Sequence, residues 1–449
     1  MRKIFGTDGV RGVANTEPMT VDTALRLGQA AAHLFSHKTR HGRFLIGKDT
    51  RLSCYMFENA IAAGIMSMGA DVFFVGPLPT PAIAYLTCSM RADAGIVISA
   101  SHNPFEHNGI KFFSSAGHKL PDEVEARMEQ LMGSDELRGS LVRGENIGRS
   151  RRIDDAAGRY ITFCKNTFPA DLTLDDLRIV VDCANGAAYK VAPLIFSELG
   201  AEVIPLGVSP NGVNINGRVG ALYPESVAEA VHTYRADLGI ALDGDADRVI
   251  ILDEKGSVVD GDAILALIAS ELLEEGRLAN RTLVTTVMSN LGLDRALREL
   301  GGSVVRTQVG DRYVFQAMLE GGHNLGGEQS GHIILRDWTT TGDGIIAALQ
   351  VLAILRRKNR AMSELARLFD PFPQVLINVD VERKPPLEDL PRLQSEIARI
   401  EQALGTTGRV LVRYSGTENK VRILVECESD RDAQRHAQDL ANLCQTECR

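Results

Sequence analysis

Short apolar strands alternate with helical segments through most of this chain, and this alternation constrains the fold more than any other feature. A helical pattern over 21–35 precedes an apolar run at 44–46, and another over 57–68 separates that run from one at 71–75. A Pro-rich stretch then leads to the apolar run at 96–98, and strand–helix–strand patterns recur over 177–206 and 282–307. Such alternation is typical of βαβ units with parallel strands. We therefore expect an α/β protein.

The last part of the chain follows another pattern. The chain has 449 residues, which is too long for a single domain, since a domain typically contains about 150 residues. A polar, Gly- and Arg-rich stretch over 133–152 predicts one boundary, and the Pro-rich segment 370–374 predicts a linker. Strand, helix, two strands and a helix follow over 375–444, which predicts a small α+β domain.

Charge and composition exclude several classes of protein. The formal net charge of −9 argues against nucleic acid or an anionic membrane as the main partner. The N-terminal residues MRKIFGTDGVRG contain no apolar signal-peptide core, and no apolar run approaches the ~20 residues of a membrane span. Seven cysteines without a CxxC pair indicate reduced thiols, and we expect a cytoplasmic protein.

The apolar run Ile96–Ile98 ends in the polar loop that contains Ser101. Open α/β sheets bind ligands at the carboxyl ends of their strands, so this serine is a candidate nucleophile. His102 is adjacent, and Lys111 follows in the next apolar segment. An ordinary loop serine that bonds its own backbone is the alternative.

Asp243, Asp245 and Asp247 alternate along a loop between two apolar, strand-like runs. Three neighbouring carboxylates repel one another unless a hard cation such as Mg²⁺ or Ca²⁺ binds them. An extended loop would point all three to one side. A calcium EF-hand is disfavoured because Arg248 takes the position of its turn glycine and the flanks are not helical. A solvated acidic turn remains the other alternative.

Three further loops carry candidate binding residues. Arg11 lies in a Gly-rich segment and suits a phosphate clamp, with a tight turn as the alternative. Glu328 and Ser330, flanked by glycines, suit a hydroxyl-rich ligand. Arg413 and the residues after it suit an anion cradle. For these last two loops a plain hairpin turn is the alternative.

Four of these stretches together resemble the α-D-phosphohexomutase superfamily over the whole chain. They are SHNP at 101–104, DGDADR at 243–248, GEQSGH at 327–332 and RYSGTE at 413–418. The opening FGTDGVRG, the GEQSGH loop and TQVGDRYV at 307–314 are most similar to the bacterial members that act on glucosamine phosphates. Related phosphomannomutases usually carry another residue at Gln329. Tyr414 and Asn419 depart from the commoner superfamily pattern.

The resemblance implies three similar α/β domains with mixed sheets and a smaller α+β C-terminal domain around a central cleft. The expected domains are 1–152 with the phosphoserine loop, 153–255 with the metal loop, 256–370 with the sugar-recognition loop, and 371–449 with the phosphate-binding loop. The resemblance further implies that the enzyme interconverts glucosamine 6-phosphate and glucosamine 1-phosphate through a 1,6-bisphosphate. This reaction would provide the precursor of UDP-N-acetylglucosamine for cell-wall synthesis.

The resemblance also implies roles for individual residues. Ser101 is expected to be phosphoserine, one Mg²⁺ per chain to bind Ser101, Asp243, Asp245 and Asp247, and glucosamine or glucose 1,6-bisphosphate to act as activator. Proton transfer is assigned to Lys111 and His332 and charge stabilisation to Arg11 and Arg248. Sugar contacts are assigned to Glu328 and Ser330, and phosphate contacts to Arg413, Ser415, Gly416 and Thr417.

Several alternatives remain open from sequence. A metal-dependent phosphatase would use the same serine and transfer the phosphate to water. A sugar-phosphate binding protein would show no turnover. Within the superfamily, a phosphoglucomutase or phosphomannomutase is the nearest rival. The sequence leaves open whether the chain forms a homodimer.

Overall fold

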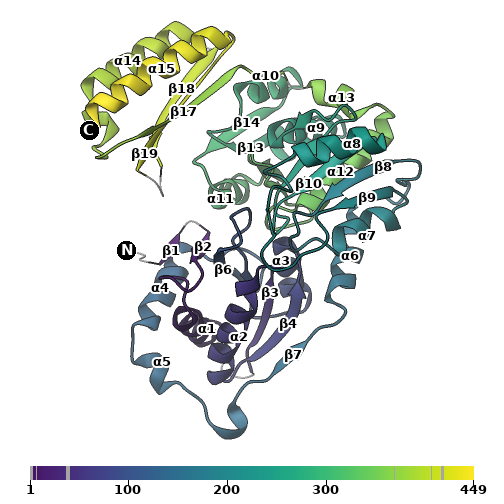
Figure 1. The fold of residues 1–449 in the computed structure, drawn as a ribbon, viewed down its shortest axis with the longest axis vertical. Helices are drawn as coiled ribbons and strands as arrows, with labels where there is room; N and C mark the ends of the chain where they lie inside the picture. Colours follow the sequence, from purple (N-terminus) through teal and green to yellow (C-terminus); the bar gives the residue numbers. More distant parts are fainter. Residues whose placement is uncertain are drawn as a thin grey trace. The chain divides into compact units, whose positions relative to one another are not determined.

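The structure is a computed structural model that describes residues 4–6, 8–36, 41–368, 370–405, 407–415 and 419–448. Its strands form four separate sheets, which follow one another along the chain (Figure 1). The chain divides into two compact units, residues 1–288 with 302–368 and residues 289–301 with 369–449. The larger unit contains three of the sheets and the smaller unit contains the fourth.

The first sheet has seven strands in the order β1-β2-β6-β5-β3-β4-β7. Strands β3, β4, β5 and β7 run parallel, whereas β1, β2 and β6 pair antiparallel. The strands are β1 (Phe5–Gly6), β2 (Gly9–Val13), β3 (Arg43–Lys48), β4 (Asp71–Pro77), β5 (Ala94–Ile98), β6 (His107–Ser114) and β7 (Ser150–Arg152). The helices are α1 (Val21–Phe35), α2 (Leu52–Ser67), α3 (Thr80–Ser89), α4 (Asp122–Met132) and α5 (Glu136–Gly139).

Helices cover both faces of this sheet because successive side chains of a strand point to opposite faces. Ile46 of β3 packs in a buried cluster with residues of α1 and α2. The next residue, Gly47, faces Ile83 of α3, which leaves no room for a larger side chain. The sheet is therefore the middle of three layers, and its loops remain accessible only at the strand ends.

The second sheet has the order β12-β11-β10-β8-β9. Strands β9, β8 and β10 are parallel, and β11 and β12 are antiparallel. The strands are β8 (Arg178–Asp182), β9 (Glu202–Leu206), β10 (Leu238–Leu242), β11 (Val249–Leu252) and β12 (Val258–Val259). The accompanying helices are α6 (Ala156–Thr167), α7 (Val191–Glu198) and α8 (Glu225–Tyr234).

The third sheet has the order β14-β13-β15-β16, with only β16 antiparallel. Its strands are β13 (Thr282–Thr286), β14 (Ser303–Thr307), β15 (Leu325–Gly327) and β16 (Ile333–Leu335). The helices of this region are α9 (Gly261–Glu274), α11 (Asp311–Gly321), α12 (Gly344–Lys358) and α13 (Met362–Leu365). Three mixed sheets with helices thus follow one another, as predicted.

The smaller unit is an antiparallel sheet with the order β17-β19-β18 and its helices. Its elements are α10 (Leu291–Glu299), β17 (Gln374–Asp380), α14 (Pro391–Leu404), β18 (Gly408–Tyr414), β19 (Lys420–Cys427) and α15 (Asp430–Glu447). The cluster of Leu393, Ile423 and Leu440 forms part of its core. This unit confirms the predicted smaller α+β C-terminal domain, whereas the exact domain boundaries stay a prediction.

Two local expectations were wrong. Helix α2 begins at Leu52 rather than at the predicted Phe57. The prediction missed its first turn because Leu52 and Tyr55 are exposed there, so the turn lacks a clear buried stripe. Strand β7 lies in the segment that we expected to be irregular. All three of its residues are exposed, and it joins the sheet through backbone pairing with β4.

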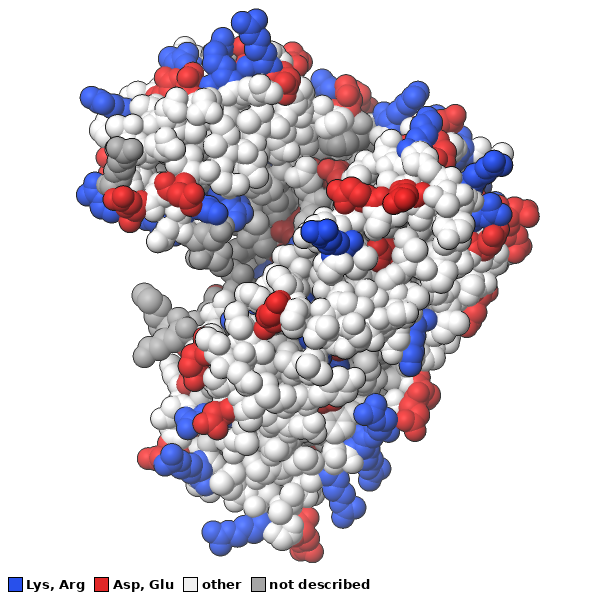
Figure 2. Space-filling view, in the orientation of Figure 1, with Lys and Arg blue, Asp and Glu red and all other residues white. Residues whose placement is uncertain are grey.

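On the face drawn in Figure 2, basic and acidic side chains are interspersed. Within the part of the chain that the structure describes, no helix combines the length and apolar character needed to cross a membrane.

Candidate active site

Ser101 lies just after β5, at the carboxyl end of the strand. Its φ of +52° is in the left-handed region, which residues with a side chain adopt only when their surroundings enforce it. The Ser101 hydroxyl donates to Oδ2 of Asp243 at 2.6 Å, and Nδ1 of His102 lies 3.3 Å from Oγ of Ser101. Burial and the positive charges of Arg248 and Arg11 lower the pKa of His102 to about 4.

Arg51 holds the loop of Ser101 in this conformation, and sequence reasoning missed it. The residue is fully buried, and its Nε donates to Oδ2 of Asp49 at 2.7 Å. Its other nitrogens donate to the carbonyl oxygens of Ser101, Asn103, Pro104 and His107. The sequence did contain one signal, because the charged residues Asp49 and Arg51 directly follow β3. Strands β3 and β5 are parallel neighbours, so residues after β3 lie beside the Ser101 loop that follows β5.

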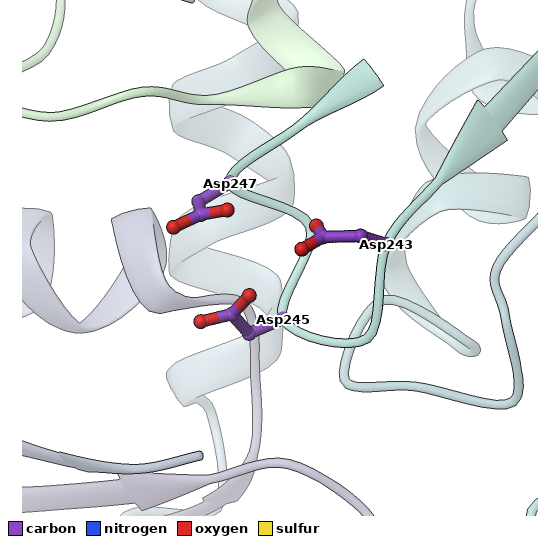
Figure 3. A group of neighbouring side chains, drawn as sticks. All are labelled: Asp243, Asp245 and Asp247. Atoms are coloured by element: carbon purple, nitrogen blue, oxygen red, sulfur yellow. The ribbon is translucent and has the colours of Figure 1, made fainter. Parts of the chain in front are cut away.

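Asp243, Asp245 and Asp247 occupy the connection between β10 and β11, and their carboxylates point toward a common space (Figure 3). One ligand oxygen from each lies within 4.8 Å of the others. They converge because the loop turns at Ala246, where φ is +56°. The expectation that an extended loop aligns them was therefore wrong, although the convergence itself is confirmed. The flanking antiparallel strands exclude an EF-hand at this loop.

The chemistry of this cluster fits a hard divalent cation. All three carboxylates are buried, and within the described residues no hydrogen bond reaches Oδ1 of Asp245 or Oδ1 of Asp247. Burial and the charges of Asp247 and Asp245 raise the pKa of Asp243 well above its usual value. A bound cation would offset the repulsion between the carboxylates and would coordinate the oxygens that accept no hydrogen bond. The loop also approaches Ser101 closely, because a Cβ at Gly244 would lie 2.6 Å from the Ser101 carbonyl oxygen.

Lys111 on β6 faces the aspartate cluster. Its Nζ lies 2.9 Å from Oδ2 of Asp245, 3.2 Å from Oδ2 of Asp8 and 3.9 Å from Oδ2 of Asp247. Burial alone would lower the pKa of Lys111, but these three carboxylates outweigh burial and raise it. Lys111 is therefore a cation in this state of the site. The Thr80 hydroxyl donates to the same Oδ2 of Asp245 at 2.6 Å.

His332 lies between two carboxylates. Its Nδ1 is 3.6 Å from Oδ2 of Asp247, and its Nε2 is 3.4 Å from Oδ2 of Asp311. The backbone N–H of Gly342 lies 3.1 Å from the same Nε2. Burial lowers the pKa of His332, but Asp247 and Asp311 outweigh burial and raise it. The imidazole can therefore accept a hydrogen bond from Gly342 when it is neutral and pair with Asp247 and Asp311 when it is protonated.

Arg11 and Arg248 flank the cluster with less tightly held side chains. Arg11 pairs with Asp8, and its side chain is 27 % exposed. Nε of Arg248 is 3.9 Å from Oδ1 of Asp247, and its side chain is 25 % exposed. Both side chains are therefore partly exposed beside the three aspartates, although Nε of Arg248 is itself buried.

Glu328, Gln329 and Ser330 form the turn between β15 and β16. Oε1 of Glu328 accepts from the backbone N–H of Gly310 at 3.1 Å, and the hydroxyl of Ser330 lies 3.5 Å from Oε2. Ser330 is exposed. Gln329 instead donates to Oδ2 of Asp260 at 3.3 Å, which ties the turn to the N-cap of α9.

Arg413 and Ser415 lie at the end of β18 in the smaller unit, so their position relative to Ser101 remains a prediction. The backbone N–H of Ser415 donates to the Lys420 carbonyl at 2.8 Å, and its own carbonyl accepts from Lys384 at 3.0 Å. Tyr414, which departs from the commoner pattern, donates its hydroxyl to the Pro385 carbonyl at 2.6 Å. The predicted binding residues Gly416 and Thr417 lie outside the described residues.

The order of the four domains matches one protein family. Models of phosphoglucomutase/phosphomannomutase match α/β/α domain I at 2–139, domain II at 158–256, domain III at 260–372 and the C-terminal domain at 376–443. The chain belongs to the phosphoglucomutase/phosphomannomutase family. Ser101, the three aspartates, and Glu328 with Ser330 fall within the matches to domains I, II and III, respectively.

Curated relatives narrow the resemblance within the phosphoglucomutase/phosphomannomutase family. The chain is 59% identical over 445 residues to a phosphoglucosamine mutase of Anaeromyxobacter sp. (strain Fw109-5), covering 98% of this chain and 95% of that one. It is 58% identical over 443 residues to a phosphoglucosamine mutase of Geobacter sp. (strain M21), covering 99% and 98%.

A solved structure supports the same fold. A crystal structure of a phosphoglucomutase/phosphomannomutase family protein from Burkholderia thailandensis matches with a TM-score of 0.81 at 24% identity. The match covers 98% of this chain and 96% of that chain. The fold of this family is therefore present across the chain. The matches to the family's domain models and to the curated mutases show that the chain is an isomerase.

Proposed function

We propose that this enzyme interconverts glucosamine 6-phosphate and glucosamine 1-phosphate through a phosphorylated Ser101 and a 1,6-bisphosphate. The observation that carries the proposal is the 2.6 Å bond between the Ser101 hydroxyl and Asp243, within a buried carboxylate cluster that Lys111 faces. The preference for glucosamine is supported by the curated phosphoglucosamine mutases that match nearly the whole chain.

The reaction has two phosphoryl transfers. In the first, a hydroxyl oxygen of the monophosphate attacks the phosphorus on Ser101, the P–Oγ bond breaks, and the hydroxyl proton leaves to a base. In the second, Oγ of Ser101 attacks the other phosphorus of the bisphosphate, and the released sugar oxygen takes up a proton. The sugar turns over between the two steps, so either end must fit the same site.

Proton transfer in this scheme falls to Lys111 and His332. Both lie beside the aspartate cluster, and each has buried carboxylate partners that hold its side chain in place. A proton carrier must lie within hydrogen-bonding reach of the reacting oxygen. Arg11 and Arg248, which are partly exposed beside the cluster, stabilise negative charge on the phosphoryl group.

Ser101, Asp243, Asp245 and Asp247 are the residues that would hold one Mg²⁺. When bound, the ion supplies charge stabilisation for the transferring phosphoryl group. This assignment is supported by Oδ1 of Asp245 and Oδ1 of Asp247, which are buried and accept no hydrogen bond within the described residues.

Glu328 and Ser330 bind sugar hydroxyls that the two orientations share, and the non-reacting phosphate binds Arg413, Ser415, Gly416 and Thr417. A carboxylate and a hydroxyl on one turn suit a hydroxyl-rich ring. Glucosamine or glucose 1,6-bisphosphate acts as activator because it restores phosphate to Ser101. The seven cysteines are all free thiols, which supports a cytoplasmic location.

The deciding experiment measures mutase turnover with Mg²⁺ and a trace of hexose 1,6-bisphosphate. The 6-phosphates of glucosamine, glucose and mannose are compared as substrates. A large preference for glucosamine 6-phosphate supports the proposal and places the enzyme in the supply of UDP-N-acetylglucosamine. Preference for glucose or mannose overturns the assigned substrate. Release of free phosphate without isomerised sugar indicates a phosphatase instead.

A further inference from the structure

Six ionisable side chains form a closed ring of ion pairs beside Ser101. Around the ring, cationic groups alternate with carboxylates, in the order Lys111, Asp8, Lys119, Asp311, His332 and Asp247. Two members, Lys119 and Asp311, belong to segments that the proposed mechanism does not use. Asp311 begins helix α11, whereas Lys119 follows β6.

Lys119 is the link between the two halves of the ring. Its Nζ lies 2.5 Å from Oδ1 of Asp8 and also pairs with Oδ2 of Asp311. Only 14 % of its side chain is exposed. Burial alone would lower the pKa of Lys119, but the charges of Asp311 and Asp8 outweigh burial and raise it. A cation held by two carboxylates at this position is a rigid connection.

Each carboxylate that Lys119 binds also contacts one of the two proposed proton carriers. The other oxygen of Asp8 lies 3.2 Å from Nζ of Lys111. The same Oδ2 of Asp311 that meets Lys119 lies 3.4 Å from Nε2 of His332. Lys119 therefore touches neither carrier but shares a partner with both.

We propose that Lys119 is a positioning residue for the phosphoryl transfers, holding Lys111 in place through Asp8 and His332 in place through Asp311. The inference rests on the proton-transfer roles proposed above for Lys111 and His332. Lys119 comes from the region of the first sheet and Asp311 from that of the third, so the contact also fixes these two parts of the larger unit against each other.

The test replaces Lys119 by Met, which keeps the length of the side chain and removes its charge. We expect kcat for glucosamine 6-phosphate to fall about 10- to 100-fold, because misplacing a reacting group by about 1 Å costs this much. We expect KM and the Mg²⁺ concentration for half-activation to stay near the wild-type values, because Lys119 contacts neither the aspartate cluster nor the proposed sugar-binding residues. Lys119→Arg restores a cation and should recover most of the lost kcat.

Arg312 provides a matched control in the same interface. Its side chain pairs with Asp122 and Glu125 of α4 and donates to the Leu120 carbonyl at 2.8 Å. Its contact with the ring is through the backbone N–H, which donates to Oδ1 of Asp311 at 2.8 Å and is kept in Arg312→Gln. Arg312→Gln should therefore weaken the interface and leave kcat close to wild type. Thermal unfolding of each variant, followed by circular dichroism, separates loss of fold from loss of positioning.

A double variant tests whether Lys119 acts through Asp311. The effects of Lys119→Met and Asp311→Asn on kcat should be strongly non-additive if both act through one contact. Wild-type kcat in folded Lys119→Met, an equal loss in Arg312→Gln, or a loss confined to KM would each overturn the inference. If the wild-type enzyme isomerises none of the three hexose phosphates, the proposed function fails and this inference falls with it.

Discussion

Ser101 is the residue whose chemistry the proposed function depends on most directly. Replacing Ser101 by Ala removes the oxygen that is proposed to accept and return the phosphoryl group and that donates to Asp243. We expect mutase turnover to fall below detection in an assay with Mg²⁺ and hexose bisphosphate. Mass spectrometry should find phosphate on Ser101 in the wild-type enzyme only.

Ser99 provides the control for this change. It lies in the same buried loop, donates its hydroxyl to Asp49 at 2.7 Å and accepts from the backbone N–H of Ser101. Ser99→Ala should cost about 1 kcal/mol of stability and keep measurable turnover, since the Ser101 oxygen remains. Appreciable turnover in Ser101→Ala would contradict the assignment of this serine.

Arg51 is predicted to be the main support of the Ser101 loop. Arg51→Met leaves the buried Asp49 carboxylate without its cation and four loop carbonyls without their donor. Losing one partner of a buried ion pair typically costs about 3–5 kcal/mol, which urea unfolding measures. Arg51→Lys keeps the charge but not the planar fork, so it should cost less stability and still lower kcat. A change below about 1 kcal/mol in Arg51→Met would refute this role.

Sequence reasoning at this scale succeeded where residue type alone indicates the chemistry. Three alternating aspartates indicate a cation site in any conformation that brings them together, and the structure does bring them together. Arg51 and Lys119 were missed because a lone Arg or Lys is usually solvated. Their importance depends on burial and on partners far away in the chain, which a single sequence does not reveal.

At the scale of elements, Asp343 makes helix α12 sensitive to pH. Its Oδ1 accepts from the backbone N–H groups of Ile345 and Ile346, and its Oδ2 accepts from the Tyr160 hydroxyl at 2.8 Å. Burial outweighs these hydrogen bonds and raises the pKa of Asp343 to about 6 from 3.8. The folded state therefore binds the proton more tightly, and this group costs stability increasingly as the pH rises from about 4 to about 6.

Asp343→Asn should abolish this contribution. We expect the variant to match wild type near pH 4 and to exceed it by up to about 3 kcal/mol above pH 7, measured by urea unfolding at several pH values. Thr20 caps α1 with an uncharged hydroxyl, so Thr20→Ala should cost about 1 kcal/mol at every pH. A pH-independent effect of Asp343→Asn would contradict the raised pKa.

The elements themselves were largely predictable, since most helices and strands bury a periodic apolar face. Helix α1, predicted at Val21–Phe35, has those bounds in the structure because Thr20 caps it and a buried stripe follows. The failures include helix α3, the first turn of α2 and strand β7, which have no such periodicity. Strand β7 forms because an open edge of the sheet pairs with its backbone, which is tertiary information.

At the scale of the whole molecule, the two units divide the proposed roles unequally. Ser101, the aspartate cluster, Lys111 and His332 all belong to the larger unit, and Arg413 and Ser415 belong to the smaller one. The resemblance to the superfamily, which rests on the four loops in order, implied the four-domain organisation. No local sequence pattern specifies how separately folded units are arranged.

Metal binding should therefore stabilise the two units differently. An ion that binds only the folded state at 100 times its Kd adds about 2.7 kcal/mol of stability. The only tryptophan, Trp338, lies in the larger unit, so its fluorescence reports the unfolding of the part that contains the three aspartates. We expect Mg²⁺ to raise this unfolding midpoint by several degrees, compared with NaCl at equal ionic strength, and Asp245→Asn to remove most of the increase.

Hydrogen exchange followed by mass spectrometry locates the same effect along the chain. Mg²⁺ should slow exchange in peptides that span β10 and β11, because the aspartate loop connects these strands. Peptides of the smaller unit that span β17, β18 and β19 should exchange at unchanged rates, since they contain none of the aspartates. Equal protection of both units, or an equal midpoint shift in Asp245→Asn and wild type, would mean that Mg²⁺ stabilises the protein from another site.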